Sequence, residues 1–123
     1  MNIATWLVQI LLVLLFFAVG LGKLIQPKDK LAERMGWVED FSPGAVKTIG
    51  ALEILAALGL ILPATTGIAS ILTPLAAVGL GIIMLGAMMV HVRRRENQEV
   101  LVNVVLLLLV AGVAWARFGP YAL

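Results

Sequence analysis

The chain has 123 residues, of which 62% are hydrophobic and 13% are charged, whereas soluble domains average about 45–50% apolar and about 25% charged residues. This composition indicates an integral membrane protein. There is no cysteine, which excludes disulfides, thiolate metal sites and thiol redox chemistry. The net charge of +2 is too small to indicate a nucleic-acid partner, and the expected surroundings are a lipid bilayer.

Four apolar segments are each long enough to cross a bilayer as a helix. They are expected at residues 3–24, 44–62, 68–92 and 98–116, within a single domain that covers residues 1–123. The first segment lacks a basic start and is longer than the apolar part of a signal peptide, so we interpret it as a retained span. The predicted fold class is therefore all-α, an integral membrane four-helix bundle.

The first connecting segment carries most of the charge between the spans. Pro27 can open a short helix there. In such a helix Leu31, Met35 and Val38 would form one apolar stripe, because spacings of three and four lie on the same side. The pattern predicts a short interfacial helix in the first loop.

Proline residues give the expected helix boundaries. Ser42 and Pro43 are predicted to be the N-cap and the first residue of the second helix. Pro63 is expected to end that helix, since proline lacks the amide donor that continues it. Pro74 is expected to kink the third span; the alternative is that the true span begins close to this proline, after a surface segment.

The distribution of basic residues predicts the orientation. Four spans place both termini on one side of the membrane, where the basic groups are Arg117 and the N-terminal amine. The other basic residues concentrate in and next to the two loops on the opposite side, residues 25–43 and 93–97. The positive-inside tendency predicts that both loops are cytoplasmic and both termini external.

Polar residues recur within each span at spacings of three and four, which marks one side of a helix. Because intramembrane polar groups normally face the interior of a bundle, the four stripes are expected to converge. Those nearest the loops are expected to form one polar cluster, consisting of Lys23, Glu53, His91 and Asn103. Gln9 and Arg117 are expected toward the opposite face.

Glu53 is the deepest member of this polar cluster. Insertion of a carboxylate at the centre of a bilayer costs roughly 2.5 kcal/mol or more, so Glu53 needs a partner, a proton or water. Three interpretations stay open. In the first, which is a structural role, Glu53 pairs with Lys23 or is protonated, and Asn103 forms a hydrogen bond across helices. In the second, Glu53, His91 and Asn103 hold the head group of a ligand in a pocket. In the third, Glu53 and His91 relay protons. A metal or haem site is not expected from one histidine and one deep carboxylate.

Four stretches resemble the DoxX-like family of small four-span bacterial membrane proteins. They are FFAVGLGKL at 16–24, GALEILAALGLILP at 50–63, LTPLAAVGL at 72–80 and GAMMVH at 86–91. The resemblance covers nearly the whole chain and includes a Gly-x-x-Lys motif that ends the first helix and a Gly-x-x-Glu motif in the second. It implies a multi-pass protein of the bacterial cytoplasmic (inner) membrane, with the polar cluster on the family's recurring polar positions.

Family members are associated with a quinone-linked thiosulfate-oxidising membrane complex, with redox-stress systems and, in a eukaryotic branch, with the assembly of ligand-gated channels. Our first functional expectation is a non-catalytic accessory or assembly subunit of a membrane complex, which can be redox-associated, with a membrane-protein partner or a homo-oligomer. Small residues in the second and third spans motivate it, because they let helices approach closely. The alternatives are a binder of a quinone or lipid-like molecule in an intramembrane polar pocket, with quinone as the candidate cofactor, and a small proton-coupled transporter.

Overall fold

The computed structural model describes residues 2–27, 29–30, 36 and 41–123. These residues form four long helices, α1 (Asn2–Ile25), α3 (Pro43–Thr66), α4 (Leu72–Arg93) and α5 (Asn97–Phe118), and none of the described residues forms a strand. All four helices are long and apolar enough to cross a membrane. The predicted all-α membrane bundle is confirmed.

The predicted interfacial helix of the first loop rests on Leu31, Met35 and Val38, which lie outside the described residues. It therefore stays a prediction.

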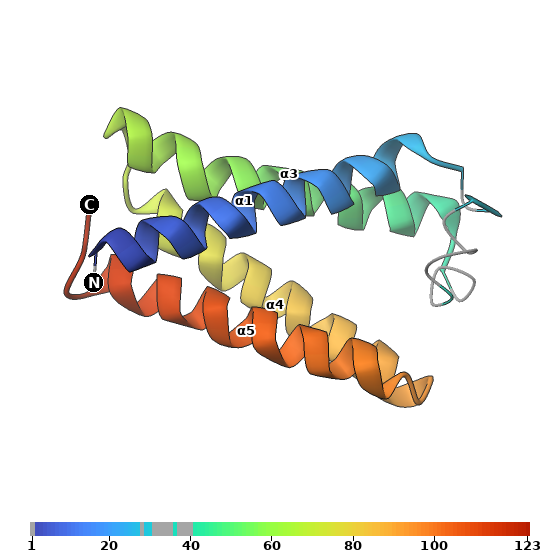
Figure 1. Cartoon of the computed structure of the whole chain (residues 1–123). Coiled ribbons are helices and arrows are strands. Elements are labelled where there is room, and N and C mark those ends of the chain that lie inside the picture. Colours follow the sequence, from blue (N-terminus) through green and yellow to red (C-terminus); the bar gives the residue numbers. More distant parts are fainter. Residues whose placement is uncertain (1, 28, 31–35, 37–40) are drawn as a thin grey trace.

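The helices are arranged as two hairpins. α1 packs along α3, and α4 packs along α5. Figure 1 shows that the two hairpins meet where the chain termini lie and diverge toward the opposite end. We call these the terminal end, with residues 2 and 119–123, and the loop end, with residues 41–42 and 94–96.

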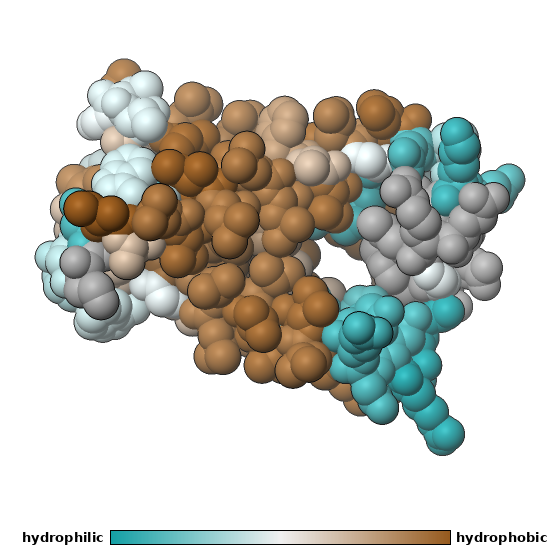
Figure 2. Space-filling view, viewed as in Figure 1, coloured by the Kyte–Doolittle hydropathy of each residue, from teal (hydrophilic) through white to brown (hydrophobic). Residues whose placement is uncertain are grey.

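Apolar side chains lie both inside and outside the bundle. The core is built from fully buried residues such as Leu12, Leu60 and Leu80. Large apolar residues such as Leu55 and Leu108 are mostly exposed, and Figure 2 shows hydrophobic side chains over the middle of the molecule and hydrophilic ones at the loop end. An apolar outer surface on helices, whose backbone groups are bonded internally, is what a lipid bilayer requires.

Two glycines let α1 and α3 approach closely. A Cβ atom on Gly20 would lie 2.7 Å from the carbonyl oxygen of Gly50, and a Cβ atom on Gly50 would lie 2.7 Å from the carbonyl oxygen of Gly20. Lys23 and Glu53 each follow their glycine by three residues, about one helical turn. The glycine contact therefore brings these two side chains opposite each other.

Pro63 does not end α3, so that prediction was wrong. The helix continues to Thr66 and ends at Gly67, whose φ of 74° is the left-handed conformation common after helix ends. Proline cannot donate to the carbonyl of Gly59 one turn earlier. The hydroxyl of Thr73 on α4 donates to this oxygen at 3.2 Å, so the carbonyl keeps a partner and the helix can pass through the proline.

The predicted kink at Pro74 was also wrong. α4 begins at Leu72, so this proline lies in the first turn, where amide groups have no partner inside the helix and a missing donor costs little. The alternative, a span that begins close to Pro74, is the correct one.

The start of α3 agrees with the sequence: the Ser42 side chain accepts a hydrogen bond from the Ala45 amide at 3.1 Å.

Candidate ligand-binding cavity

Polar contacts close the terminal end of the bundle. The guanidinium of Arg117 donates from Nε to Gln9 Oε1 at 3.0 Å and from Nη1 to Asn2 Oδ1 at 2.8 Å and the Tyr121 carbonyl at 2.9 Å. The Gln9 amide in turn donates to the carbonyl of Leu60 on α3. Gln9 and Arg117 therefore lie together at this end, away from the loop-end cluster, and tie α1, α3 and α5 to one another.

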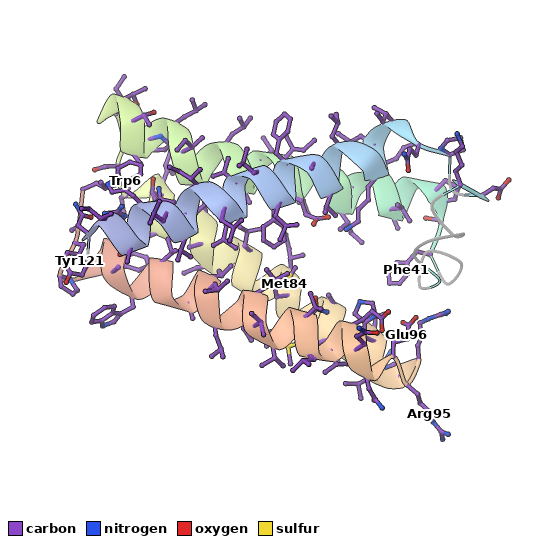
Figure 3. All side chains as sticks on the ribbon, viewed as in Figure 1. Trp6, Phe41, Met84, Arg95, Glu96 and Tyr121 are labelled. Carbon is purple, nitrogen blue, oxygen red and sulfur yellow. The ribbon has the colours of Figure 1, made fainter. Side chains whose placement is uncertain are left out.

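At the loop end the diverging hairpins enclose a cavity of about 720 Å³. All four helices line it, together with loop residues that include Gly36 and Phe41. Its apolar part includes Phe16 and Met84, which belong to the buried core, and Leu106, which packs against that core. Figure 3 shows Met84 inside the bundle and Phe41 at the loop end. The volume is within the range of about 300–1,000 Å³ that is usual for small-molecule sites.

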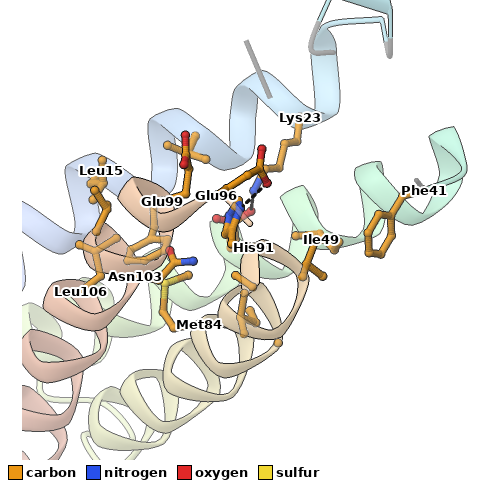
Figure 4. A pocket seen from close by; sticks show the side chains of 18 of the residues that line it. Leu15, Lys23, Phe41, Ile49, Met84, His91, Glu96, Glu99, Asn103 and Leu106 are labelled. Atoms are coloured by element: carbon orange, nitrogen blue, oxygen red, sulfur yellow. Dashed lines mark hydrogen bonds and ion pairs between the residues drawn. The ribbon is translucent and has the colours of Figure 1, made fainter. Parts of the chain in front are cut away.

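Each helix contributes one residue of the predicted polar cluster to the wall of this cavity. They are Lys23 from α1, Glu53 from α3, His91 from α4 and Asn103 from α5. Figure 4 shows Lys23, His91 and Asn103 at the cavity. Their exposed fractions are 7%, 2%, 9% and 8% in that order. The structure thus brings all four residues to one cavity; their role in binding stays a prediction.

Lys23 and Glu53 form a buried ion pair. The distance from Lys23 Nζ to Glu53 Oε1 is 2.5 Å. This contact is the pairing that the structural interpretation of Glu53 predicts. Because the two charges lie next to each other, the deep carboxylate does not face the apolar interior alone.

His91 is held by a residue that the sequence reasoning did not single out. Its Nδ1 lies 2.9 Å from Glu96 Oε1, and the Nε of Arg94 donates to the same oxygen at 3.2 Å. The Glu96 amide also donates to the His91 carbonyl at 2.9 Å. A carboxylate five residues after a histidine, just beyond a helix end, is the signal in the sequence that could have identified this contact.

Asn103 differs from the other three members of the polar cluster. Its amide nitrogen Nδ2 is buried and has no hydrogen-bond partner within the described part of the chain. A buried donor without a partner costs about 1–3 kcal/mol. The cavity therefore contains one polar group whose hydrogen bonding the described residues do not satisfy.

The cavity also has an opening on the side of the bundle. α1 and α5 make far fewer contacts than either hairpin makes internally, and the lining residues Leu15 and Val102, one from each helix, are 37% and 53% exposed. Figure 2 shows a hollow between α1 and α5, next to the hydrophilic loop end. This slot lies where the apolar surface of the bundle meets the hydrophilic loop end.

These features define a small four-span membrane protein with a polar cavity between two helical hairpins. The sequence model of the DoxX-like family matches residues 7–113, which include all four members of the polar cluster. The chain belongs to the DoxX-like family. No curated protein and no solved structure matches it.

Proposed function

We propose that this protein binds an amphipathic small molecule, such as a quinone or a lipid-like compound, in the loop-end cavity. The observation that carries the proposal is the composition of the cavity wall. Four buried polar side chains, one from each helix, lie next to an apolar region built from Phe16, Met84 and Leu106. Binding sites for small molecules combine apolar walls with a few placed polar groups in this way.

The side slot supports a ligand that comes from the bilayer. A molecule dissolved in the hydrocarbon layer can pass between Leu15 of α1 and Val102 of α5 without crossing the charged loops. A polar head group would then lie among the buried polar residues, while the apolar body contacts the apolar wall or extends into the slot.

The expectation of an accessory subunit rested on small residues that would contact a partner. Gly50, Ala57 and Ala77 are buried within the bundle. The other two small residues, Ala56 and Gly81, are half-buried; Ala56 packs against the core, and Gly81 faces Leu107 and Val110 of α5. All five therefore serve the bundle's own helix packing. These residues therefore give no argument for a partner, and a role within a larger complex or a homo-oligomer stays a prediction.

The proton-relay interpretation is less favoured, because Glu53 and His91 are each held by another residue.

We propose that the protein lies in the bacterial cytoplasmic (inner) membrane, with loops 25–43 and 93–97 on the cytoplasmic side and both termini outside. The loop end carries Arg94 and Arg95, and Arg93 ends α4 next to them. The positive-inside tendency supports this orientation.

A matched pair of variants on α5 tests the proposed binding. Val102 lines the cavity and is 53% exposed, whereas Val105 does not line it and is 50% exposed. Val102→Trp should fill the slot and part of the cavity, while Val105→Trp adds the same group to the lipid-facing surface. Each protein would be purified in a mild detergent and examined by native mass spectrometry for a bound small molecule.

The wild type and Val105→Trp should retain the same bound species, and Val102→Trp should lose it. A wild type that never carries a bound species, or equal retention by the two variants, would overturn the proposal. Thermal unfolding of both variants would show that they are equally well folded.

A further inference from the structure

We infer that the head group of the bound molecule is uncharged, a carbonyl or hydroxyl group that forms a hydrogen bond with Asn103. The inference rests on the proposed function and names the class of ligand that the cavity selects. It follows from how the charges of the cavity wall are distributed.

The deepest charges of the wall already neutralise each other. Lys23 and Glu53 are 2.5 Å apart and are almost completely buried. A ligand with a full charge at this depth would compete with an existing pair and would leave one wall charge without its counter-charge. The desolvation of an unmatched buried charge is costly.

The second group of wall charges is compensated in the same way. Glu96 lies within 2.9 Å of His91 and 3.2 Å of Arg94. Its carboxylate is thus engaged by a cationic neighbour and an imidazole. Neither group of charges calls for a counter-ion from the ligand.

Asn103 provides a buried hydrogen-bonding group that the described residues leave unsatisfied. Its side chain is 8% exposed, it lines the cavity, and its amide nitrogen has no partner among the residues that the structure describes. An amide is uncharged and offers a donor and an acceptor. A carbonyl or hydroxyl oxygen satisfies the donor without introducing a charge into the buried site.

Glu99 adds selection against anions at the exposed part of the cavity wall. It lies one turn before Asn103 on α5, lines the same cavity and is exposed. Its carboxylate repels an anionic head group such as that of a fatty acid. A cationic head group could pair with Glu99, but it would then stay beside this exposed carboxylate and leave the buried Asn103 amide unsatisfied.

The test compares four probes with the same fourteen-carbon chain: 2-tetradecanone, tetradecan-1-ol, tetradecanoate and tetradecylammonium. Each is added to the protein in lipid nanodiscs, and its occupancy is measured by native mass spectrometry. The ketone and the alcohol should bind about tenfold or more tightly than both charged probes, because a buried hydrogen bond is gained without the burial of an unmatched charge.

Two α5 variants assign the selectivity to Asn103. Asn103→Leu should weaken binding of the ketone and the alcohol by about tenfold, whereas Asn97→Leu, at an exposed position that does not line the cavity, should leave it unchanged. The wild-type comparison does not depend on whether Asn103→Leu folds.

The outcomes separate this inference from the proposed function. If a charged probe binds as tightly as the neutral probes or more tightly, and Val102→Trp abolishes this binding, the inference of an uncharged head group is overturned. The cavity would then still be a binding site. Probe binding that Val102→Trp does not change, or no probe binding, would count against the cavity itself. Selectivity that persists in a folded Asn103→Leu protein would overturn the role of Asn103.

Discussion

Gly20 and Gly50 face each other where α1 crosses α3, and a Cβ atom added to either would come within 2.7 Å of the carbonyl oxygen of the other. The contact is reciprocal and involves backbone atoms, which cannot rotate away as a flexible side chain can. It also determines how closely Lys23 and Glu53 can approach. Packing and charge pairing in this hairpin therefore depend on the same crossing.

Gly50→Ala should lower the free energy of unfolding by about 1–3 kcal/mol, since the added methyl group forces the two helices apart. Gly22→Ala is the matched control, because a Cβ atom on Gly22 meets no atom within 4 Å. An alanine there should be neutral or stabilising by up to about 1 kcal/mol. Thermal unfolding in detergent checks both, and equal melting temperatures for the two variants would contradict the close crossing.

Substitution of one member of the buried ion pair should lower the free energy of unfolding more than substitution of both members. Glu53→Leu leaves the Lys23 ammonium without its carboxylate partner and should destabilise the protein by about 3–5 kcal/mol. The double variant Lys23→Met/Glu53→Leu should recover most of this loss. A double-mutant cycle from chemical unfolding gives the coupling energy, and additive effects would show that the pair does not act as a unit.

Arg117→Lys should destabilise the terminal end, even though the charge is kept. A lysine cannot reproduce the planar fork that donates to Gln9, Asn2 and the Tyr121 carbonyl. We expect a loss of about 1.5–3 kcal/mol, the value of one hydrogen bond to a charged group. Arg93→Lys at an exposed position should change stability by less than about 0.5 kcal/mol, and a similar loss in both would contradict the prediction.

The absence of native cysteine allows a clean test of orientation. Arg95→Cys at the loop end and Gly119→Cys at the terminal end each introduce one exposed thiol. In intact bacterial spheroplasts, a membrane-impermeant maleimide should label Gly119→Cys and not Arg95→Cys until the membrane is permeabilised. The reverse pattern would invert the proposed orientation.

The sequence predicted which residues face the interior more successfully than it predicted helix boundaries. Lys23, Glu53, His91 and Asn103 could be grouped because helical spacing and the cost of intramembrane polar groups both act locally. The prediction for Pro63 was wrong because the Thr73 hydroxyl, on another helix, bonds the carbonyl that the proline leaves free. The prediction for Pro74 was wrong because this proline lies in the first turn of its helix. A proline in the sequence reveals neither the partner on another helix nor the residue at which its own helix begins.

The cavity could not be derived from the sequence, because it depends on the angle between the hairpins. The polar stripes are compatible with a closed cluster as well as with an open one. Glu96 was missed because its contact with His91 requires the chain to turn back on itself after α4. That the Asn103 amide nitrogen has no hydrogen-bond partner among the described residues follows from the positions of all the helices and not from the sequence around Asn103.

The connection between the hairpins has a mechanical consequence. The first loop joins α1 to α3 and residues 94–96 join α4 to α5, so the sole covalent link from one hairpin to the other is residues 67–71, at the terminal end (Figure 1). A helix of 24 residues is about 36 Å long, and a tilt of about 10° at one end displaces the other by about 6 Å. A rotation of one hairpin relative to the other would thus have its axis near Gln9 and Arg117, at the terminal end. A small tilt of one hairpin would therefore change the width of the cavity while every helix keeps its backbone hydrogen bonds.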